Sequence, residues 1–349
     1  MNKLEEAVEE NDIGLDYTSF HGAIFPLSKQ YMKGYHSVLQ IHWVSVLFAA
    51  EVRNPVKFWI RYILAYLDIW YVRNILSAKI VWTVHNLYSH DAIRKNLDLR
   101  ARRFLAKQSD ILLLHGPSAI PLVTEAYKVD KSKCVCIPHG NQKGAFPMEI
   151  SKFDAREKLQ IGQNKKVLLF FGTLRKYKGV EELIEAFKSI DDENLFLLIA
   201  GKCRDESYRK ELMGMADDRT LITDSFVPID EVQVYMAAAD IVVLPFKEIL
   251  TSGSLLLAMT FGKMIVAPRM GTLPDYLLPE GGILYDEKNE NLKIALNRAM
   301  EMDTEKAGDF NKEKVDLFDW DRIGDSVADW YRKLIDSNNP HPKKKNWFQ

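Results

Sequence analysis

Two cationic side chains form the part of this sequence best suited to holding a charged ligand. Arg175 and Lys178 follow Gly172, which ends the apolar run 166–171. A short apolar run bounded by glycine predicts a buried strand, and the glycine lets backbone approach a ligand closely. An amphipathic pattern starts after Gly179, so the cations stand at the entrance of a predicted helix. Fixed amides, the positive end of the helix dipole and two cations together favour a diphosphate.

A second candidate anion site is the segment 251–254, with the sequence Thr-Ser-Gly-Ser. It follows the apolar run 241–244 and precedes another apolar run, 255–259, so it lies at a predicted strand-to-helix turn. Small hydroxyl residues around a glycine can cap a helix and also bind an anion. Each segment alone has an ordinary explanation, either surface charges on a solvated loop or a helix cap. Two such turns on neighbouring strands favour ligand binding.

The order of motifs over 166–285 resembles the C-terminal domain of GT-B glycosyltransferases, specifically the family 4-like group (glycosyl transferases group 1). The motifs are F-G-x-x-R-x-x-K-G, L-I-A-G, A-A-D-I-V-V-L-P and S-G-S-L-L-L-A-M-x-F-G-K-M-I-V-A-P. A weaker resemblance covers 36–140. It implies an α/β chain of GT-B architecture, with two Rossmann-like domains facing a cleft, and it suggests sugar transfer with retention of configuration.

The resemblance also assigns roles to residues of the C-terminal half. Arg175 and Lys178 match the cations that neutralise the donor diphosphate, and are expected to be catalytic in that sense. The implied donor-binding residues are Gly172, Thr173, Arg175, Lys178, Gly201, Val227, Glu248, Thr251, Ser252, Gly253 and Ser254. The nucleotide sugar is a substrate, so no cofactor is expected.

The segment 245–257 departs from the family pattern. The family carries two glutamates separated by seven residues in this loop, and Ile249 and Leu257 occupy those places here. Glu248 is one position away from the first, and no carboxylate replaces the second, which holds the nucleotide ribose in the family. Two interpretations follow: the Ser-Gly-Ser backbone and hydroxyls substitute for the carboxylates, or donor binding is impaired.

A histidine in the N-terminal half is a further candidate. His85 ends the apolar run 79–85 within the motif T-V-H-N. The motif resembles the family element whose histidine faces the donor sugar, which makes His85 a tentative catalytic residue. The alternative is a hydrogen-bonded structural histidine at a strand end.

No metal site is expected. Asp319-Trp320-Asp321 matches the D-x-D pattern of another glycosyltransferase fold, but it opens an amphipathic stretch where aspartate is a good helix cap. The cysteines and histidines also lack the spacing of a metal site.

Length and composition predict a globular chain of two domains. The 349 residues are 47% hydrophobic and 27% charged, and the net charge of −1 argues against general nucleic-acid binding. The predicted divisions are an acceptor-side domain (1–150) that starts on a helix without the usual first strand, a nucleotide-sugar domain (151–318), a helix crossing back (319–337) and a tail (338–349). The competing fold, a single dehydrogenase-like sheet, requires G-x-G-x-x-G after a strand, which is absent.

Two basic segments of the N-terminal half raise the question of a membrane partner. Segment 55–78 mixes aromatic and cationic residues and is interrupted by charges, so it is too polar to span a bilayer. It is either an interfacial helix or a core helix with cationic ends. Segment 94–107 is a basic helix, either solvated or facing phospholipid. We therefore expect a cytoplasmic protein, with an anionic membrane surface as a candidate peripheral partner at the inner face.

The function predicted from the sequence is sugar transfer from a nucleotide-sugar donor to a glycan or lipid-linked acceptor in glycan biosynthesis. The alternative from another class is a non-catalytic GT-B domain that acts as a partner in a glycan-assembly complex. Ile249 and Leu257 favour this alternative, whereas the intact cations Arg175 and Lys178 favour the enzyme.

Overall fold

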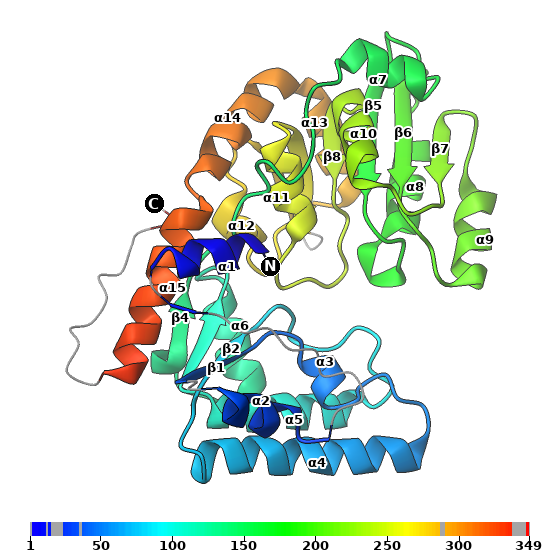
Figure 1. Cartoon of the computed structure of the whole chain (residues 1–349). Helices are drawn as coiled ribbons and strands as arrows, with labels where there is room; N and C mark the ends of the chain where they lie inside the picture. Colours follow the sequence, from blue (N-terminus) through cyan, green and yellow to red (C-terminus); the bar gives the residue numbers. More distant parts are fainter. Residues whose placement is uncertain are drawn as a thin grey trace. The chain divides into compact units, whose positions relative to one another are not determined.

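The computed structural model describes residues 2–11, 13–14, 24–34, 37–286, 290–336 and 347–348. The chain forms two compact units (Figure 1). Unit 1 contains Met1–His139 and Trp320–Gln349, and unit 2 contains Gly140–Asp319. Most of the tail predicted for 338–349 lies outside the described residues.

The predicted domain boundary near residue 150 lies inside unit 2. The segment before it is hydrogen-bonded to that unit: Asn141 N donates to Phe318 O (2.8 Å), and Ile150 N donates to Gln233 Oε1 (3.2 Å). These bonds between distant residues are why glycine and proline content alone misplaced the boundary.

Unit 1 is built on a four-stranded parallel sheet in the order β1-β2-β3-β4. Its strands are β1 (Val38–Ile41), β2 (Lys79–Thr83), β3 (Ile111–Leu114) and β4 (Cys134–Cys136). Its helices are α1 (Asn2–Glu9), α2 (Pro26–Lys33), α3 (Val44–Leu47), α4 (Pro55–Asn74), α5 (Lys95–Gln108), α6 (Ala119–Tyr127) and α15 (Trp320–Ile335), with the 3-10 turn η1 (Lys131–Lys133). The inner strands β2 and β3 are short, almost wholly buried apolar runs, as expected where helices cover both faces of a parallel sheet.

The last helix, α15, packs against the first, α1, within unit 1. Gly324 allows the close approach, since a β-carbon there would lie 2.4 Å from Ala7 O. Arg332 closes the contact by donating to Asn11 O at 2.7 Å. The chain therefore returns to unit 1 at Trp320, and its D-x-D-like segment is the start of this helix rather than a loop.

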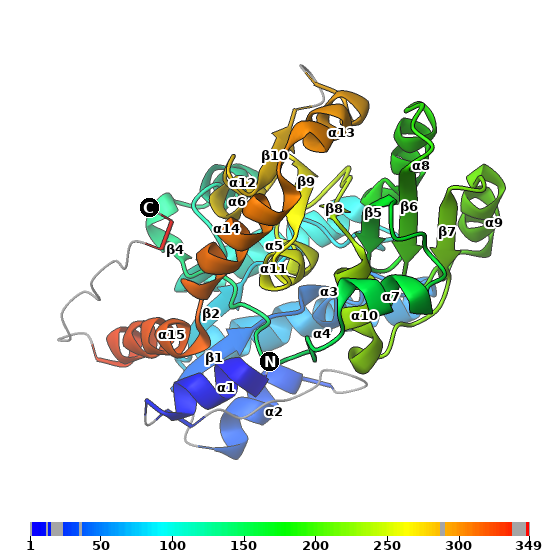
Figure 2. The same cartoon turned by 90° about the horizontal axis from the view of Figure 1, so that it is seen from above.

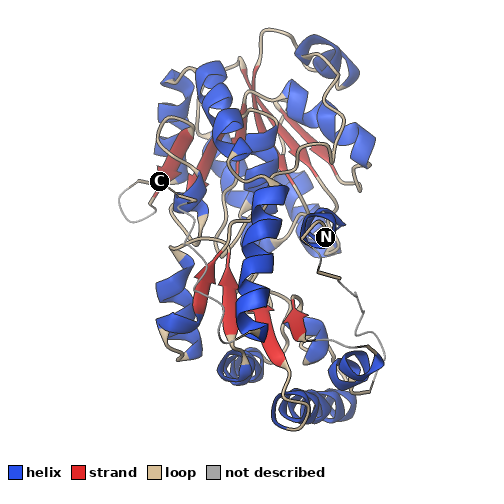
Figure 3. Cartoon of the chain, turned by 60° about the vertical axis from the view of Figure 1, so that its left-hand side comes forward, coloured by secondary structure: helices blue, strands red, loops and turns tan. Residues whose placement is uncertain are grey.

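Unit 2 is built on a six-stranded parallel sheet in the order β10-β9-β8-β5-β6-β7. Its strands are β5 (Lys166–Phe171), β6 (Leu195–Ala200), β7 (Thr220–Thr223), β8 (Ile241–Val243), β9 (Met264–Pro268) and β10 (Gly282–Tyr285). Its α-helices are α7 (Lys152–Lys158), α8 (Val180–Lys188), α9 (Glu206–Met215), α10 (Val232–Ala238), α11 (Gly253–Thr260), α12 (Leu273–Tyr276), α13 (Leu292–Glu301) and α14 (Thr304–Asp316), with 3-10 turns η2 (Lys176–Lys178) and η3 (Ile229–Glu231). The parallel direction of the strands in each sheet can be followed in Figure 3.

Helices cover both faces of this sheet (Figure 2). Helices α8, α9 and α13 share one core with the β5, β6 and β8 side chains that point to their face, among them Phe170, Ile199 and Val243. Helices α7, α10, α11 and α14 pack on one another and on β5 and β9 at the other face. Two-sided covering is why the unit 2 strands read as continuous apolar runs instead of alternating ones.

The two basic segments of unit 1 are organised differently from a simple charged surface. No helix in the described ranges is long and apolar enough to cross a bilayer. Arg73 of α4 pairs with Asp110 (2.7 Å), and buried Arg102 of α5 pairs with Asp98 (2.8 Å). Arg103 donates to Ala126 O (2.8 Å). These three arginines stabilise the fold of unit 1. The expectation that the cations of these two segments face lipid headgroups therefore does not hold for them.

The ends of β5 and β6 depend on two glycines. Gly172 has φ +142° and Gly201 has φ +150°, and a β-carbon on Gly201 would lie 1.8 Å from Gly172 O. We predict that Gly201→Ala lowers the free energy of unfolding by at least about 2 kcal/mol, because strain and a backbone clash add. Gly214→Ala, in α9 with open space around it, is the control and should gain up to about 1 kcal/mol. Urea unfolding of both variants measures this, and equal stabilities would contradict it.

Candidate functional site

The backbone at the ends of β5 and β6 forms the base of the predicted anion site. Gly172 N donates to Ala200 O and Gly201 N donates to Thr223 O, each at 3.0 Å, so the sheet ladder continues to the two glycines. Beyond them, Leu174 N donates to Lys202 O at 3.0 Å, and the Leu174 side chain is buried. The turn after β5 is thus anchored at both its start and its middle.

Lys178 occupies the centre of this turn. It ends η2, and its ammonium lies 4.4 Å from the ring centroid of Phe246, which is fully buried. Burial lowers the pKa of Lys178 to about 8, and the neighbouring Arg175 charge adds to the effect. A cation held in a desolvated place beside another cation is stabilised by any anion that reaches it.

The loop after β8 is joined to this turn. Lys247 N donates to Tyr177 O at 2.9 Å, and Gly179 approaches Pro245 O so closely that a β-carbon there would lie 2.0 Å from it. The Lys247 ammonium pairs with Glu181 (2.8 Å) and Glu182 (2.9 Å), both in the first turn of α8. Lys247 therefore neutralises acids that would otherwise weaken an anion site at this helix end.

Phe246 and Lys247 are parts of the site that the sequence analysis missed. Their signal was present in the chain, since they directly follow the strand-ending motif A-A-D-I-V-V-L-P. What the sequence could not give is their contact with the turn 173–179, which exists only because β8 pairs with β5.

The segment 251–254 lies at the same edge of the sheet. Ser252 caps α11, its Oγ accepting from Leu255 N at 3.2 Å. Ser254 Oγ is 3.6 Å from the position that a β-carbon on Gly172 would take. Gln142 supports the helix end by donating to Gly253 O at 3.1 Å. The structure therefore brings the two predicted anion turns together, with Gly172 between them.

The remaining predicted donor residues lie in the loops around these two turns. Thr173 is exposed directly after Gly172, and Glu248 is exposed after Lys247. Thr251 is half-buried before the α11 cap. Val227 is half-buried in the loop after β7, a strand that pairs with β6 and not with β5. The structure therefore places Val227 farther along the sheet than the others.

The two positions that carry glutamate in the similar family are occupied here by Ile249 and Leu257. Leu257 is buried in α11, with 5% of its surface exposed. The carbonyl of Ile249 contacts Gly271, where a β-carbon would lie 2.6 Å from it. Neither position offers a carboxylate, so the polar groups available in this segment are Glu248 and the hydroxyls and amides of 251–254.

His85 belongs to unit 1, where it is one of a row of four histidines. The others are His42 directly after β1, His115 directly after β3 and His139 a few residues after β4. Because the four strands are parallel and adjacent, their carboxyl ends bring the four imidazoles to one edge. A histidine follows every strand of this unit in the sequence, but only His85 was predicted as a site residue.

The rings of this histidine row are in contact. His42 Nδ1 and His85 Nε2 are 3.2 Å apart, and Trp43 stacks on His85 with ring centroids 4.6 Å apart. His115 is 5.3 Å from both His85 and His139, centroid to centroid. Burial, and then repulsion from neighbouring imidazoles, lowers the pKa of His85 to about 3, and burial lowers that of His42 to about 4. Burial also lowers the pKa of His115 well below its usual value, so His42, His85 and His115 are neutral at physiological pH. They can exchange hydrogen bonds but bring no positive charge.

Part of the chain matches a known protein family. Residues 151–314 match the family described as glycosyl transferases group 1. Over these residues, the chain is similar to members of that family. A GDP-mannose:glycolipid 4-beta-D-mannosyltransferase of Xanthomonas campestris is 34% identical over 103 residues. These residues are 29% of this chain and 30% of the mannosyltransferase, so the chain spans less than a third of that relative's length.

Solved structures resemble the chain over most of its length. Sucrose-phosphate synthase from Thermosynechococcus elongatus matches with a TM-score of 0.70 and 21% identity, covering 89% of this chain and 77% of that one. Anabaena HepE in complex with UDP and glucose matches with a TM-score of 0.67 and 17% identity, covering 94% and 88%. The predicted α/β class and GT-B fold are confirmed, and the match to group 1 glycosyltransferases confirms the resemblance.

The neutral histidine row predicts a specific acid sensitivity of unit 1. An unfolded histidine takes up a proton near pH 6.5, whereas His42 and His85 resist protonation until about pH 4 and 3. The unfolded state therefore binds more protons as the pH falls below 6.5, and each histidine costs up to about 1.4 kcal/mol per pH unit. We expect His42→Asn/His85→Asn to lose less stability than the parent chain between pH 7 and pH 5. Urea midpoints at both pH values measure this, and parallel losses would refute it.

Proposed function

We propose that this protein is a glycosyltransferase that moves a sugar from a nucleotide-sugar donor to a glycan or lipid-linked acceptor. The observation that carries the proposal is that Ser254, at the capped end of α11, lies beside Gly172, the first residue of the turn that carries Arg175 and the desolvated Lys178. The similar HepE structure contains UDP and glucose, and the name of the related mannosyltransferase specifies GDP-mannose and a glycolipid. The match of residues 151–314 to a glycosyltransferase family supports the same class of reaction.

In the proposed mechanism, unit 2 stabilises the nucleoside diphosphate as it leaves the sugar. The charge that develops on the diphosphate oxygens is met by Lys178 and Arg175 and by amides near Ser254, which are in place before the reaction. No metal or cofactor takes part in this proposal, since these groups supply the electrostatic stabilisation. His85, neutral at physiological pH, can hydrogen-bond a sugar hydroxyl without adding charge. Retention of configuration is part of the proposal through the family resemblance.

The absent glutamates require another way to hold the nucleotide. We propose that Thr251, Ser252 and Ser254, with the amides of their segment, take over part of this role. The alternative, a non-catalytic GT-B domain in a glycan-assembly complex, is favoured by buried Leu257. The desolvated Lys178 opposes this alternative, because a buried cation lowers stability in a protein that never binds an anion there.

Nucleotide binding distinguishes these two proposals. Titration calorimetry with UDP, GDP and ADP should detect one preferred nucleotide. Arg175→Ala and Lys178→Met should weaken that binding by roughly ten- to a thousandfold, on the scale of losing one charged donor from a preorganised site. Lys176→Met is the matched control: it removes an exposed cation of the same turn that pairs only loosely with Glu211 (3.7 Å), and binding should stay within about twofold. Absence of binding by all three nucleotides would favour the non-catalytic partner.

The acceptor side of the proposal rests on α4. An apolar stripe along this helix remains exposed, and its members have between 37% and 66% of their surface open. The stripe, called the α4 stripe below, consists of Val56, Trp59, Ile60, Ile63, Leu67, Trp70 and Tyr71. The opposite face of the helix buries Phe58, Tyr62 and Ile69 in the core of unit 1. The buried face therefore agrees with the core-helix interpretation, and the exposed stripe supports the interfacial interpretation as a proposal.

We propose that the α4 stripe lies on an anionic membrane surface, at the cytoplasmic face, where a lipid-linked acceptor would be reached. Exposed aromatic and aliphatic side chains flanked by Lys57 and Arg61 are suited to the boundary between headgroups and acyl chains. With three arginines of α4 and α5 engaged inside unit 1, the binding is expected to depend more on the apolar stripe than on charge.

Sedimentation with vesicles tests this membrane proposal. The protein should sediment with phosphatidylcholine vesicles that contain phosphatidylglycerol, and Ile63→Ser/Leu67→Ser should lose most of this binding through lost apolar burial. Ile229→Ser/Ile294→Ser removes two exposed isoleucines from unit 2 as a control and should sediment like the parent chain. Equal sedimentation of both double variants, or none by the parent chain at low salt, would reject the proposal.

A further inference from the structure

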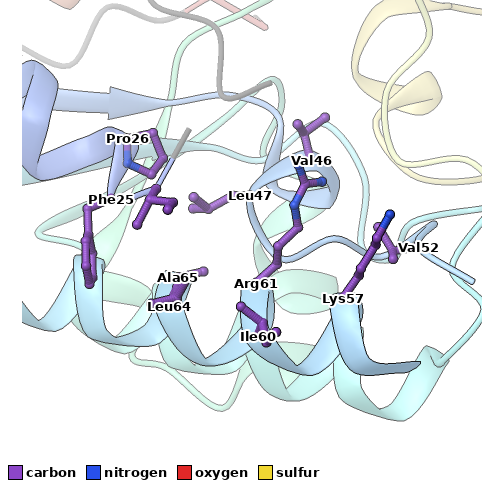
Figure 4. A pocket seen from close by; sticks show the side chains of 11 residues that line it. Phe25, Pro26, Val46, Leu47, Val52, Lys57, Ile60, Arg61, Leu64 and Ala65 are labelled. Atoms are coloured by element: carbon purple, nitrogen blue, oxygen red, sulfur yellow. The ribbon is translucent and has the colours of Figure 1, made fainter. Parts of the chain in front are cut away.

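A pocket opens in unit 1 beside α4. Its volume is about 500 Å³, within the roughly 300–1,000 Å³ of small-molecule pockets. Apolar side chains from α2, α3 and the chain around them make most of its lining, including Phe25, Val46 and Leu47 (Figure 4). From α4, Ile60, Leu64 and Ala65 complete the apolar wall.

One wall of the pocket is fixed by a buried carboxylate. Asp68, wholly buried on α4, accepts from Leu27 N at 2.8 Å and from Ser28 N at 3.0 Å. These amides belong to the first turn of α2, so Asp68 serves as a cap supplied by another helix. Helices α2 and α4 are thereby held together, and the pocket between them is part of the fold.

Two cations stand in this otherwise apolar lining. Lys57 and Arg61 are one turn apart on α4, both are exposed, and Figure 4 shows their side chains rising from the same side of the helix. Neither forms an ion pair with any acidic residue in the described ranges. Like charges at this spacing repel, so the pair is an uncompensated positive site at the edge of an apolar hollow.

The pocket also continues into the α4 stripe. Ile60 lines the pocket and, with 54% of its surface exposed, is also a member of the stripe. An apolar chain that lies along the stripe can therefore enter the pocket without crossing a polar barrier. A pocket beside an exposed helix can bind one hydrocarbon chain specifically, which the helix surface alone cannot do.

We propose that this pocket binds a lipid phosphate with a single hydrocarbon chain, the chain filling the hollow and the phosphate contacting Lys57 and Arg61. The lining fits both parts of such a molecule: the chain is stabilised by burial against apolar surface, and the phosphate by the two adjacent cations. This inference rests on the proposed function for its meaning, since the lipid phosphate would be the anchored end of the acceptor.

The size of the pocket decides between possible lipids. The single hollow of about 500 Å³ has room for the first part of one hydrocarbon chain, whereas a phospholipid carries two chains for each phosphate. A neutral lipid would leave Lys57 and Arg61 uncompensated. The single-chain phosphate is therefore the favoured occupant, and the other two are outcomes of the test.

Three short-chain probes separate the occupants in calorimetry with the full chain, with farnesol used below its solubility limit. Farnesyl phosphate should bind, and farnesol and dihexanoyl phosphatidate should each bind at least tenfold more weakly. Equal binding of farnesol would overturn the role of the two cations. Equal binding of dihexanoyl phosphatidate would overturn the single-chain assignment in favour of bilayer phospholipid.

Matched variants on α4 locate the binding. Leu64→Trp fills the pocket and should weaken farnesyl phosphate binding at least tenfold, whereas Leu67→Trp, on the α4 stripe, should leave it within about twofold. Lys57→Gln/Arg61→Gln should weaken it at least tenfold, and Lys95→Gln/Arg100→Gln, which removes two exposed cations of α5, should not. Equal effects within either pair of variants would overturn the pocket site, as would no binding by the parent chain.

The test is independent of the proposed sugar transfer. Farnesyl phosphate binding is measured without a donor and should survive Arg175→Ala, while nucleotide binding should survive Leu64→Trp. Loss of nucleotide binding alone therefore counts against the proposed function, and loss of lipid binding alone counts against the pocket.

Discussion

The backbone contact between Gly172 and Gly201 is the constraint on which the candidate site depends. The two glycines end neighbouring strands, and no side chain fits where their backbones meet. The turn after β5 can therefore fold over the sheet edge and reach the loop after β8, where Pro245 packs on Gly179. Without this contact, Lys178 could not be held over Phe246, and Ser254 would not lie beside the end of β5. The chemistry is positioned by residues that have no side chains.

Electrostatics in the two units follow opposite rules. Unit 2 holds Lys178 partly desolvated, and Lys247 pairs with the acids at the start of α8, so that an anion near this turn meets positive charge. Unit 1 places four imidazoles side by side, and burial keeps His42, His85 and His115 neutral. In the proposed transfer, positive charge stabilises a leaving diphosphate, whereas neutral imidazoles can hydrogen-bond hydroxyls without adding charge.

The strand ends could be predicted from the sequence, whereas the partners of the charged residues could not. Each apolar run that ends in a small residue became a parallel strand, so Gly172 and the segment 251–254 were found where expected. Arg73 looked like a surface cation because its partner Asp110 lies far along the chain and is brought to it only by the fold of unit 1. The domain boundary failed for the same reason, since Asn141 bonds to Phe318 far along the chain. Local sequence patterns predict the helices and strands, whereas contacts between distant residues determine which charged side chains are paired.

Helix α4 shows why composition alone left its role open. One face carries Phe58 and Ile69 into the core, and Asp68, which reads as a break in an apolar segment, caps α2 instead. Once Asp68 is inside and Arg73 is paired with Asp110, the charges left outside on this helix are Lys57 and Arg61, both beside the pocket. The fold has thus sorted the mixed sequence of α4 into a buried face, an apolar stripe and a cationic flank. Such sorting is the reason that aromatic and basic residues in one helix can serve the core and a ligand at the same time.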